Sequence, residues 1–421
     1  MICKKEYLLL KEMNIVDNNI VKFKFKISKN LSKYFNRNYI LIEYPKSINL
    51  HDIPESILII PFVSCLLPLM WLTDSIMWIS EIDRTFYHSL HYIKNGYQEM
   101  YDYYVLKGSL IPAKIVENDY KIIKESLVLF SGGLDAHTTY LRHINEKPLL
   151  FYIQGWYEDD FNSLNKVERN DIINISTFAN MQNVKFMSVR SNFATTVNND
   201  TFHKYIERKL KDNWWHGFQH SMAFISIAIP ISYYFGIKQI YIASSFCLGD
   251  AGRCASYPTT DSEFAFATKG IVIHDGFELS RQDKIKMIID YQKQIHDRYP
   301  LKVCTFKEEN CCICEKCIRT ILGIIAENGD LEDFGFHLNK PILTYFSNDF
   351  IDNIVFFDVE GESIKHWKYI KERMRVNFHN IDENDFVNWF LTVDLLRIRK
   401  KKLLEYRIKN FPCLLLKRLK V

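Results

Sequence analysis

The fold of this chain is decided by the stretch Ser126-Leu127-Val128-Leu129-Phe130-Ser131-Gly132-Gly133-Leu134-Asp135-Ala136-His137-Thr138-Thr139-Tyr140. Its apolar run at 127–130 is typical of a short strand buried in a parallel sheet. Two adjacent glycines follow, and they let backbone N–H groups converge where a Cβ atom would intrude. A helical pattern begins near Asp135, so the positive end of the helix dipole faces the same loop. The stretch therefore predicts a strand, an anion-binding loop and a helix.

The loop lacks both common phosphate-binding patterns, G-x-x-x-x-G-K-[ST] and G-x-G-x-x-G. Ser-Gly-Gly-x-Asp-[Ser/Ala] after a strand instead resembles the PP-loop of the ATP pyrophosphatase superfamily. Members of that superfamily cleave ATP between the α and β phosphates and activate a substrate as its adenylate. The alternative is an ordinary tight turn between a strand and a helix, because short glycine patterns also arise by chance.

Composition indicates a globular protein. The chain has 421 residues, which suggests two or three domains, and 48% of them are hydrophobic while 25% are charged. The net charge of +4 gives no strong case for nucleic-acid binding. The first residues lack the apolar core and cleavage site of a signal peptide, so we expect a cytoplasmic location. In a reducing compartment the ten cysteines are ligands or buried thiols rather than a disulfide framework.

Residues 1–120 look like an independent α+β accessory module. Alternating patterns at 20–27 and 39–44 predict paired strands, and 76–101 predicts a strand followed by an amphipathic helix. The segment 57–72 is apolar almost throughout, but it contains two prolines and falls short of the ~20 residues that span a bilayer. We therefore expect a buried helix and no transmembrane span. The module carries no recognisable chemistry, so it either builds a wall of the site, binds a partner or serves as scaffold.

Residues 121–345 alternate between strand and helix patterns, as an α/β sheet with helices on both faces requires. Further buried strands are expected at 149–154, 184–189 and 239–243, and an apolar helix is expected at 223–235. Ligands of open α/β sheets bind outside the carboxyl ends of the strands. Four segments should therefore converge on an ATP site: 131–135, 154–156, 188–190 with Ser188, and 244–245 with Ser244. Residues 248–261 then predict a lid or substrate loop.

A second strong pattern is a cluster of thiols. Cys311, Cys314 and Cys317 form overlapping C-x-x-C steps, and Cys304 supplies a fourth sulfur. Four thiolates suit a tetrahedral structural zinc ion, with Cys312 as a surplus thiol. An iron–sulfur cluster is the alternative, although nothing else in the sequence calls for electron transfer.

The glycine loop followed by C-x6-C-x2-C-x2-C resembles the 7-cyano-7-deazaguanine synthases, the QueC or ExsB group of PP-loop ATPases. The resemblance covers roughly residues 126–325. It implies a Rossmann-like, mostly parallel sheet of the adenine nucleotide alpha hydrolase type with a structural zinc site. It also implies an ATP-dependent carbon–nitrogen ligase that adenylates a deazaguanine-type carboxylate, releases pyrophosphate and AMP, and transfers the acyl group to ammonia or a protein amine. Enlarged members with extra terminal regions occur in phage-defence and polysaccharide gene clusters, and this chain resembles that type.

The resemblance assigns roles to individual residues. ATP phosphates and Mg²⁺ would be held by Ser131, Gly132, Gly133, Leu134, Asp135 and Ala136, of which Ser131 and Asp135 would be catalytic. Zinc would be held by Cys304, Cys311, Cys314 and Cys317. His216, Asp261, Arg281 and Lys284 fall near the substrate segments. Ala136 departs from the family, which has a second serine there, and Thr138 or Thr139 is the candidate to replace the missing hydroxyl.

Several residues have both a functional and a structural interpretation. Arg281 and Lys284 lie one helical turn apart and suit a polyphosphate, or else they form an exposed helix surface. Cys254 is a candidate nucleophile among thiols that are usually inert. His203, His216, His220 and His274 are candidate bases or phosphate ligands, and Trp214 and Trp215 are candidates for stacking on a purine or for core packing.

The last region, 346–421, is expected to be mainly helical and basic. Residues 346–357 mix strand and turn signals, whereas the tail from 395 carries ten Lys or Arg residues against one acid, Glu405. A basic amphipathic helix there would contact an anionic membrane surface, nucleic acid or an acidic protein partner, or would be a solvated face. Two other functions also remain open: a tRNA-modifying PP-loop enzyme and a degenerate nucleotide-binding module.

Overall fold

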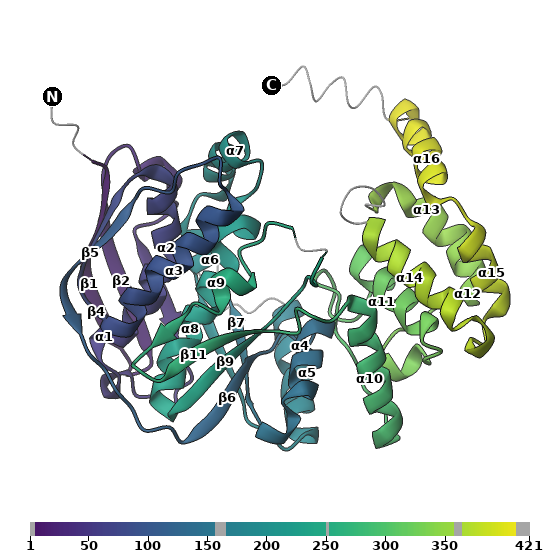
Figure 1. Cartoon of the computed structure of the whole chain (residues 1–421), viewed down its shortest axis with the longest axis horizontal. Coiled ribbons are helices and arrows are strands. Elements are labelled where there is room, and N and C mark those ends of the chain that lie inside the picture. Colours follow the sequence, from purple (N-terminus) through teal and green to yellow (C-terminus); the bar gives the residue numbers. More distant parts are fainter. Residues whose placement is uncertain (1–4, 156–165, 250–251, 358–363, 410–421) are drawn as a thin grey trace. The chain divides into compact units, whose positions relative to one another are not determined.

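The computed structural model describes residues 5–155, 166–249, 252–357 and 364–409, which form two compact units (Figure 1). Unit 1 consists of residues 1–131, 139–245 and 253–277. Unit 2 consists of residues 132–138, 246–252 and 278–421. This division differs from the three consecutive segments that the sequence suggested, because the start of the helix after the glycine loop groups with the C-terminal residues.

Unit 1 is built on an 11-stranded sheet with the order β10-β11-β9-β6-β7-β8-β3-β2-β1-β4-β5. The strands are β1 (Tyr7–Val16), β2 (Ile20–Ile27), β3 (Tyr39–Glu43), β4 (Ile76–Asp83), β5 (Ser109–Val116), β6 (Lys124–Leu129), β7 (Leu149–Gln154), β8 (Phe186–Ser191), β9 (Ile237–Ala243), β10 (Ala265–Phe266) and β11 (Gly270–Asp275). Pairing is parallel from β11 through β9, β6 and β7 to β8, and antiparallel from β8 through β3 and β2 to β1. The protein is thus an α/β protein with a mostly parallel sheet, and the four strands expected from 127 to 243 are present.

The order of the parallel strands reverses next to β6. From β6 the chain adds β7 and then β8 on one side, whereas β9 and β11 follow on the other side. The connection after β6 therefore leads to β7 on one side, and the connection after β9 leads toward β11 on the opposite side. In open α/β sheets such a reversal marks the crevice where ligands bind.

The helices of unit 1 cover this sheet. They are α1 (Glu55–Leu58), α2 (Ile60–Thr73), α3 (Arg84–Met100), α4 (Leu134–Arg142, whose first residues belong to unit 2), α5 (Lys166–Met181), α6 (Phe193–Thr196), α7 (Asn199–Leu210), a π-helix at Trp215–Gln219, α8 (His220–Phe235) and α9 (Pro258–Asp261). Helix α2 is buried on every side and packs against α8, which confirms the expected buried helix. Of the helices within the described ranges, none combines the length and the apolar character needed to cross a membrane.

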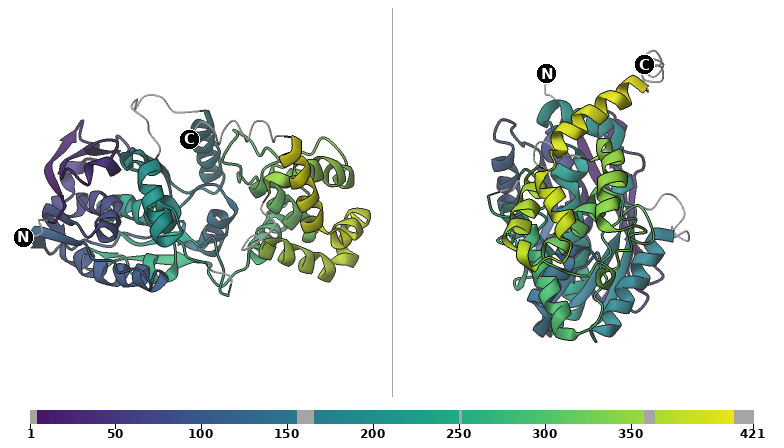
Figure 2. Two further views of the ribbon diagram at one scale, coloured as in Figure 1. Left: turned by 90° about the horizontal axis from the view of Figure 1, so that it is seen from above. Right: turned by 90° about the vertical axis from the view of Figure 1, so that its right-hand side faces the viewer.

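Residues 1–120 share one sheet and one core with the strands that follow them. Strand β3 pairs with β8 through Ile42 and Ser191, and helix α3 contacts both β5 and β10, which are the two end strands of the sheet. Asp83, at the end of β4, accepts hydrogen bonds from the backbone N–H groups of Phe86 (2.9 Å) and Ala267 (3.0 Å). The sheet therefore curls around its helices, and the purple N-terminal strands belong to the same body as the later ones (Figures 1 and 2).

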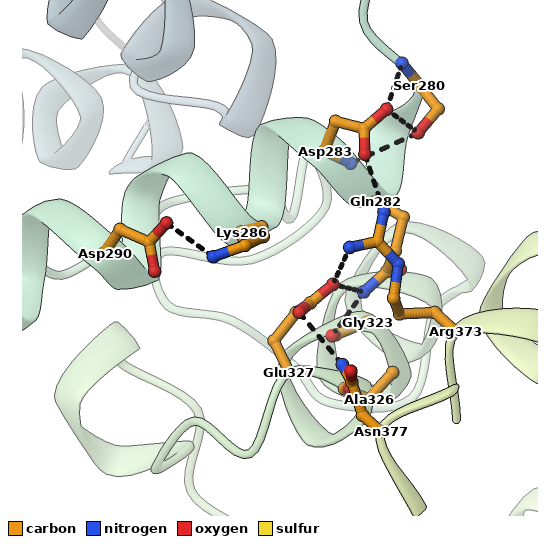
Figure 3. A network of polar contacts seen from close by, with 10 residues as sticks. All are labelled: Ser280, Gln282, Asp283, Lys286, Asp290, Gly323, Ala326, Glu327, Arg373 and Asn377. Atoms are coloured by element: carbon orange, nitrogen blue, oxygen red, sulfur yellow. Dashed lines mark hydrogen bonds and ion pairs between the residues drawn. The ribbon is translucent and has the colours of Figure 1, made fainter. Parts of the chain in front are cut away.

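Unit 2 is helical from Arg281 onward. Its helices are α10 (Arg281–Ile295), α11 (Glu315–Ala326), α12 (Ile342–Thr344), a π-helix at Tyr345–Phe350, α13 (Ile351–Asn353), α14 (Ile364–Val376), α15 (Asn384–Thr392) and α16 (Leu395–Lys409). Figure 3 shows how α10, α11 and α14 are joined. Arg373 of α14 donates to Asp283 (2.6 Å) and pairs with Glu327 (3.1 Å), while Gln282 donates to the Gly323 carbonyl (2.8 Å).

The strand signals at 346–357 were wrong. This segment continues from the π-helix through α13 into a short 3₁₀-helix at Ile354–Phe356. Phe346, Phe350 and Ile354 recur every four residues and are all buried, with at most 1% exposure. That spacing places them on one helical face, so packing overrides the strand preference of aromatic and β-branched side chains.

The basic tail forms α16 up to Lys409, and the remaining residues lie outside the described part of the chain. The helix is not amphipathic, because apolar and basic side chains alternate around its whole circumference. Leu404 and Ile408 are 60% and 67% exposed. The predicted amphipathic face is therefore absent from the described residues of the tail.

Candidate functional site

The glycine loop has the predicted local structure. Strand β6 ends at Leu129 and α4 begins at Leu134, so the loop between them is four residues long. Gly132 has a φ of 74°, a left-handed conformation that favours glycine. The Gly133 carbonyl accepts the first helical hydrogen bond, from the N–H of His137 (3.0 Å). The preceding N–H groups have no partner within the helix, as at any helix start.

Asp135 lies in the first turn of α4 and is bound by two cations of α10. Lys284 Nζ donates to its carboxylate at 3.0 Å, and Arg281 lies 3.8 Å from it. Lys284 is only 2% exposed, so the exposed-surface interpretation of this helix face is wrong for Lys284. Burial acts to raise the pKa of Asp135, but the charges of Lys284 and Arg281 outweigh it and hold the pKa below its ordinary value. The carboxylate is therefore ionised and already neutralised by the protein's own cations.

Two further cations complete a basic cluster at this point, which we call the cation cluster: Arg281, Lys284, Lys316 and Arg319. Lys316 and Arg319 belong to α11 and interact electrostatically with Arg281. Arg281 donates to Thr320 Oγ1 (3.1 Å), and burial lowers its pKa to about 10, so it stays charged at neutral pH.

One donor of the cation cluster has no partner among the described residues. The Nε atom of Arg281 is buried and has no hydrogen-bond partner there, whereas the Nε atom of Arg319 lies 3.5 Å from the Glu315 carboxylate. A buried charged donor without a partner is costly, and an oxygen atom of an anion would satisfy it. The cluster is therefore suited to a phosphate chain.

The four predicted zinc ligands come together at the start of α11. The Sγ atoms of Cys304, Cys311, Cys314 and Cys317 all lie within 4.8 Å of one another, and those of Cys311 and Cys317 are 3.9 Å apart. Four sulfurs at the usual zinc–sulfur distance would be about 3.8 Å apart, so this arrangement fits one tetrahedral ion. The Cys314 N–H donates to Cys311 Sγ (3.3 Å), which orients that sulfur.

Cys312 is outside the ligand set, as expected. Its backbone is left-handed, with a φ of 57°, and its thiol turns to the Asn310 carbonyl (3.6 Å). The Cys312 carbonyl accepts a hydrogen bond from the Tyr345 hydroxyl (2.6 Å). A polynuclear iron cluster would hold its cysteine sulfurs on separate iron atoms and further apart, so the observed spacing favours a single ion such as zinc.

The serines predicted at the strand ends lie in unit 1. Ser131 follows β6 by two residues and Ser244 directly follows β9, which places both at the reversal of strand order. Ser188 is instead in the middle of β8, paired with Tyr152, because the strand runs on to Ser191. Ser188 lines a separate cavity of about 450 Å³ together with Gln154, Glu43 and Arg190, among others.

The two substrate candidates of unit 1 have different settings. Asp261 is fully buried in α9 and is held by Ser256 Oγ (2.6 Å) and His274 Nδ1 (2.8 Å), so it faces protein rather than solvent. His216 is in the π-helix, with its side chain 43% exposed and its Nδ1 3.1 Å from Asp212. The expected loop at 248–261 lacks regular structure up to Tyr257, apart from residues 250–251, which lie outside the described residues.

Thr138 is not positioned to replace the serine missing at Ala136. Thr138 Oγ1 donates to the Leu134 carbonyl (3.0 Å), so its hydroxyl is used within α4. Thr139 is buried, with 1% exposure. Ala136 itself is 4% exposed.

The cation cluster was only half predicted. Arg281 and Lys284 were candidates, but Lys316 and Arg319 were missed although one lies inside the cysteine motif and the other lies two residues after it. Their spacing of three residues on a helix that begins at Glu315 was the available signal.

Comparison with known proteins gave no relatives: no protein-family model, no curated protein and no solved structure matches this chain.

Proposed function

We propose that this protein is an ATP-dependent ligase that binds the triphosphate of ATP at the glycine loop and the cation cluster. It cleaves ATP between the α and β phosphates, forms the adenylate of a small carboxylate and passes the acyl group to a nitrogen nucleophile. The observation that carries this proposal is the cation cluster, in which the buried Arg281 Nε has no hydrogen-bond partner among the described residues, in the unit that also contains the glycine turn. Phosphate oxygens accept hydrogen bonds both from guanidinium groups and from the backbone N–H groups of a glycine turn.

Each part of the chain contributes a definite step. Arg281, Lys316 and Arg319 offset the negative charge that builds up on the leaving pyrophosphate, and this electrostatic stabilisation is the main catalytic effect in phosphate chemistry. Asp135 fixes Lys284 and Arg281 in place. Because the Asp135 carboxylate is already neutralised, we expect Mg²⁺ to enter the site bound to ATP rather than to be bound beforehand by Asp135.

The strand order supports the same proposal. The parallel order β11-β9-β6-β7-β8 is that of a Rossmann-like sheet, and the glycine loop leaves β6 at the reversal point where such sheets bind nucleotides. Zinc bound by the four cysteines would have a structural role, since all four positions of a tetrahedral ion are then filled by protein. The deazaguanine-type carboxylate, the choice between ammonia and a protein amine, and a role in phage defence rest on the resemblance alone.

The direct test is product release by the full-length protein. With magnesium-ATP and a panel of small carboxylates that includes a deazaguanine carboxylate, we expect AMP and pyrophosphate in equal amounts for at least one carboxylate. Ammonia in the same assay should convert the adenylate into the amide. ADP and phosphate as products, or nucleotide binding with no turnover, would contradict the proposed reaction.

Lys316→Ala is expected to weaken ATP binding about tenfold to a hundredfold, because it removes one charged contact worth about 1.5–3 kcal/mol. Lys316 is exposed, so its loss should leave thermal stability nearly unchanged. The matched control is Lys286→Ala, another exposed lysine, on α10, that pairs with Asp290 at 2.7 Å, outside the cation cluster (Figure 3). Titration with ATP should separate the two variants, and equal affinities would place the phosphates elsewhere.

Ala136→Ser is expected to tighten ATP binding or speed adenylation by up to about tenfold to a hundredfold, since it adds a hydroxyl donor to phosphate. Stability should change little. Because the Thr138 hydroxyl is used within α4, Thr138→Ala should leave nucleotide affinity unaltered. If the serine gains nothing and Thr138→Ala weakens binding, the threonine already supplies the contact and our assignment of its hydroxyl is wrong.

A further inference from the structure

A second cluster of reactive side chains lies in unit 1. It contains Asp212, His216, His220 and Cys254. His216 Nδ1 lies 3.1 Å from Asp212 Oδ1, and because a carboxylate only accepts hydrogen bonds, Nδ1 carries a proton. The Cys254 thiol interacts electrostatically with both His216 and His220.

The carboxylate of this cluster is firmly held. Asp212 accepts from the Tyr101 hydroxyl (2.7 Å) and from the Asn213 N–H (2.7 Å) in addition to His216. Gly217 is packed so tightly here that a Cβ atom would lie 2.6 Å from the Tyr101 oxygen. Three donors and a close-packed backbone fix the orientation of Asp212, and through it the ring of His216.

A backbone hydrogen bond next to Cys254 holds its thiol near the two histidines. The Ala255 N–H donates to the His216 carbonyl (2.7 Å), which ties the residue after Cys254 to the π-helix. A second imidazole approaches the sulfur, with His220 Nε2 3.8 Å from Cys254 Sγ. His220 Nδ1 lies 2.9 Å from the Trp215 carbonyl, so Nδ1 carries a proton and Nε2 faces the sulfur.

Electrostatics favour the ion pair of thiolate and imidazolium. Burial acts to raise the pKa of the Cys254 thiol, but His216 and His220 outweigh it and lower the pKa to about 6. The hydrogen bond to Asp212 raises the pKa of His216 to about 10. The charged or titratable groups that face this thiol or its histidines are Tyr97, Tyr101, Asp212, His216, His220, Arg253 and Asp261. At neutral pH the sulfur is therefore ionised next to a protonated ring.

We propose that Cys254, His216 and Asp212 form a second catalytic site, in which the thiolate accepts an acyl group from an ester or thioester. The thiolate attacks the carbonyl carbon, a C–S bond forms, and the bond to the leaving group breaks as His216 gives that group its proton. Water or an amine then loses a proton to His216 and attacks the thioester. The C–S bond breaks and the thiolate is restored.

The surroundings limit the acyl donor. The Ala255 N–H is used by the His216 carbonyl, so it does not serve as a donor to an oxyanion. This favours esters and thioesters, whose leaving groups depart readily, over unactivated amides. Cys254 is 5% exposed and the His216 side chain is 43% exposed, which suits a small acyl group.

The first experiment measures alkylation of Cys254 by iodoacetamide in the full-length protein, read by peptide mass spectrometry against pH. We expect the rate to rise with a midpoint near pH 6. His216→Asn should move the midpoint toward the value of an ordinary thiol, near 8.5, and slow the reaction at pH 6.5 about tenfold or more. The matched control is His203→Asn, since the His203 side chain is 44% exposed and lies on α7 away from the thiol. It should behave as wild type.

The second experiment uses p-nitrophenyl acetate as the acyl donor. We expect a burst of nitrophenolate and an acetyl group on Cys254, both absent in Cys254→Ser, strongly slowed in His216→Asn and unchanged in His203→Asn. Asp212→Asn should slow acylation. It should also lower the upper pH limit above which acylation is lost. An alkylation midpoint above pH 8 in wild type, or acetylation that spares Cys254, would overturn the proposal. Because the alkylation profile is measured on the wild-type protein, poor folding of a variant leaves the test intact.

Discussion

Asp135→Ala is expected to abolish pyrophosphate release and to lower the free energy of unfolding by about 3 kcal/mol. The variant removes the carboxylate that offsets the charge of Lys284, which is only 2% exposed. A charge left in a buried site without its partner is strongly destabilising. We expect the activity to be lost because Asp135 positions Arg281, a member of the cation cluster.

Two controls separate the stability effect from the catalytic one. Asp290→Ala breaks the exposed pair with Lys286, whose side chains are each 50% exposed, and should cost less than about 1 kcal/mol. Asp135→Ala combined with Lys284→Met should regain most of the lost stability, because methionine fills the space of the lysine stem without a charge. Denaturant unfolding and pyrophosphate release measured on all variants give the result. Normal pyrophosphate release in Asp135→Ala would remove the glycine loop from the mechanism.

The purified protein is expected to contain one zinc ion per chain, and Cys317→Ser should abolish zinc binding and unfold the region around it. Cys317 is fully buried in the first turn of α11. Structural zinc sites contribute apparent binding free energies of about 10–16 kcal/mol in small peptides, which is comparable to the stability of a whole domain. Loss of the ion should also weaken ATP binding, because Lys316 and Arg319 lie on the same helical turns.

Cys312→Ser is the matched control for the metal. Cys312 is a buried thiol in the same loop, but its sulfur faces the Asn310 carbonyl and not the other four sulfurs. This variant should keep one zinc ion and unfold close to wild type. Elemental analysis of both variants decides the matter, and iron in place of zinc, or a protein without metal, would refute the assignment.

The sequence predicted the elements whose signals are local. The apolar runs of β6, β7 and β9 and the cysteine spacing each lie within a few residues, so periodicity and motif were sufficient. The helical segment around Phe350 was missed because burial by distant side chains, not local preference, decides its conformation.

The candidate site depends on contacts that sequence patterns do not encode. Lys284 meets Asp135 across 149 residues of chain, and no local pattern reports such a pairing. Three members of the second cluster, Cys254, His216 and His220, were predicted as separate candidates, and Asp212 was not predicted. The histidine and the aspartate, four residues apart at 216 and 212, show the helical spacing that would have linked them. The functions assigned from the glycine loop remain predictions that the assays above test.

Unit 2 is assembled from three separate stretches of the chain, and this has a consequence for synthesis and inheritance. At the ribosome, Asp135 emerges 149 residues before Lys284, a delay of roughly 7 to 30 seconds at ordinary elongation rates. During that interval Asp135 has no contact with Lys284, which has not yet been synthesised. A gene fragment that began after the loop would encode a buried lysine whose aspartate is missing. The C-terminal helices on their own are therefore expected to be less stable than the complete unit 2.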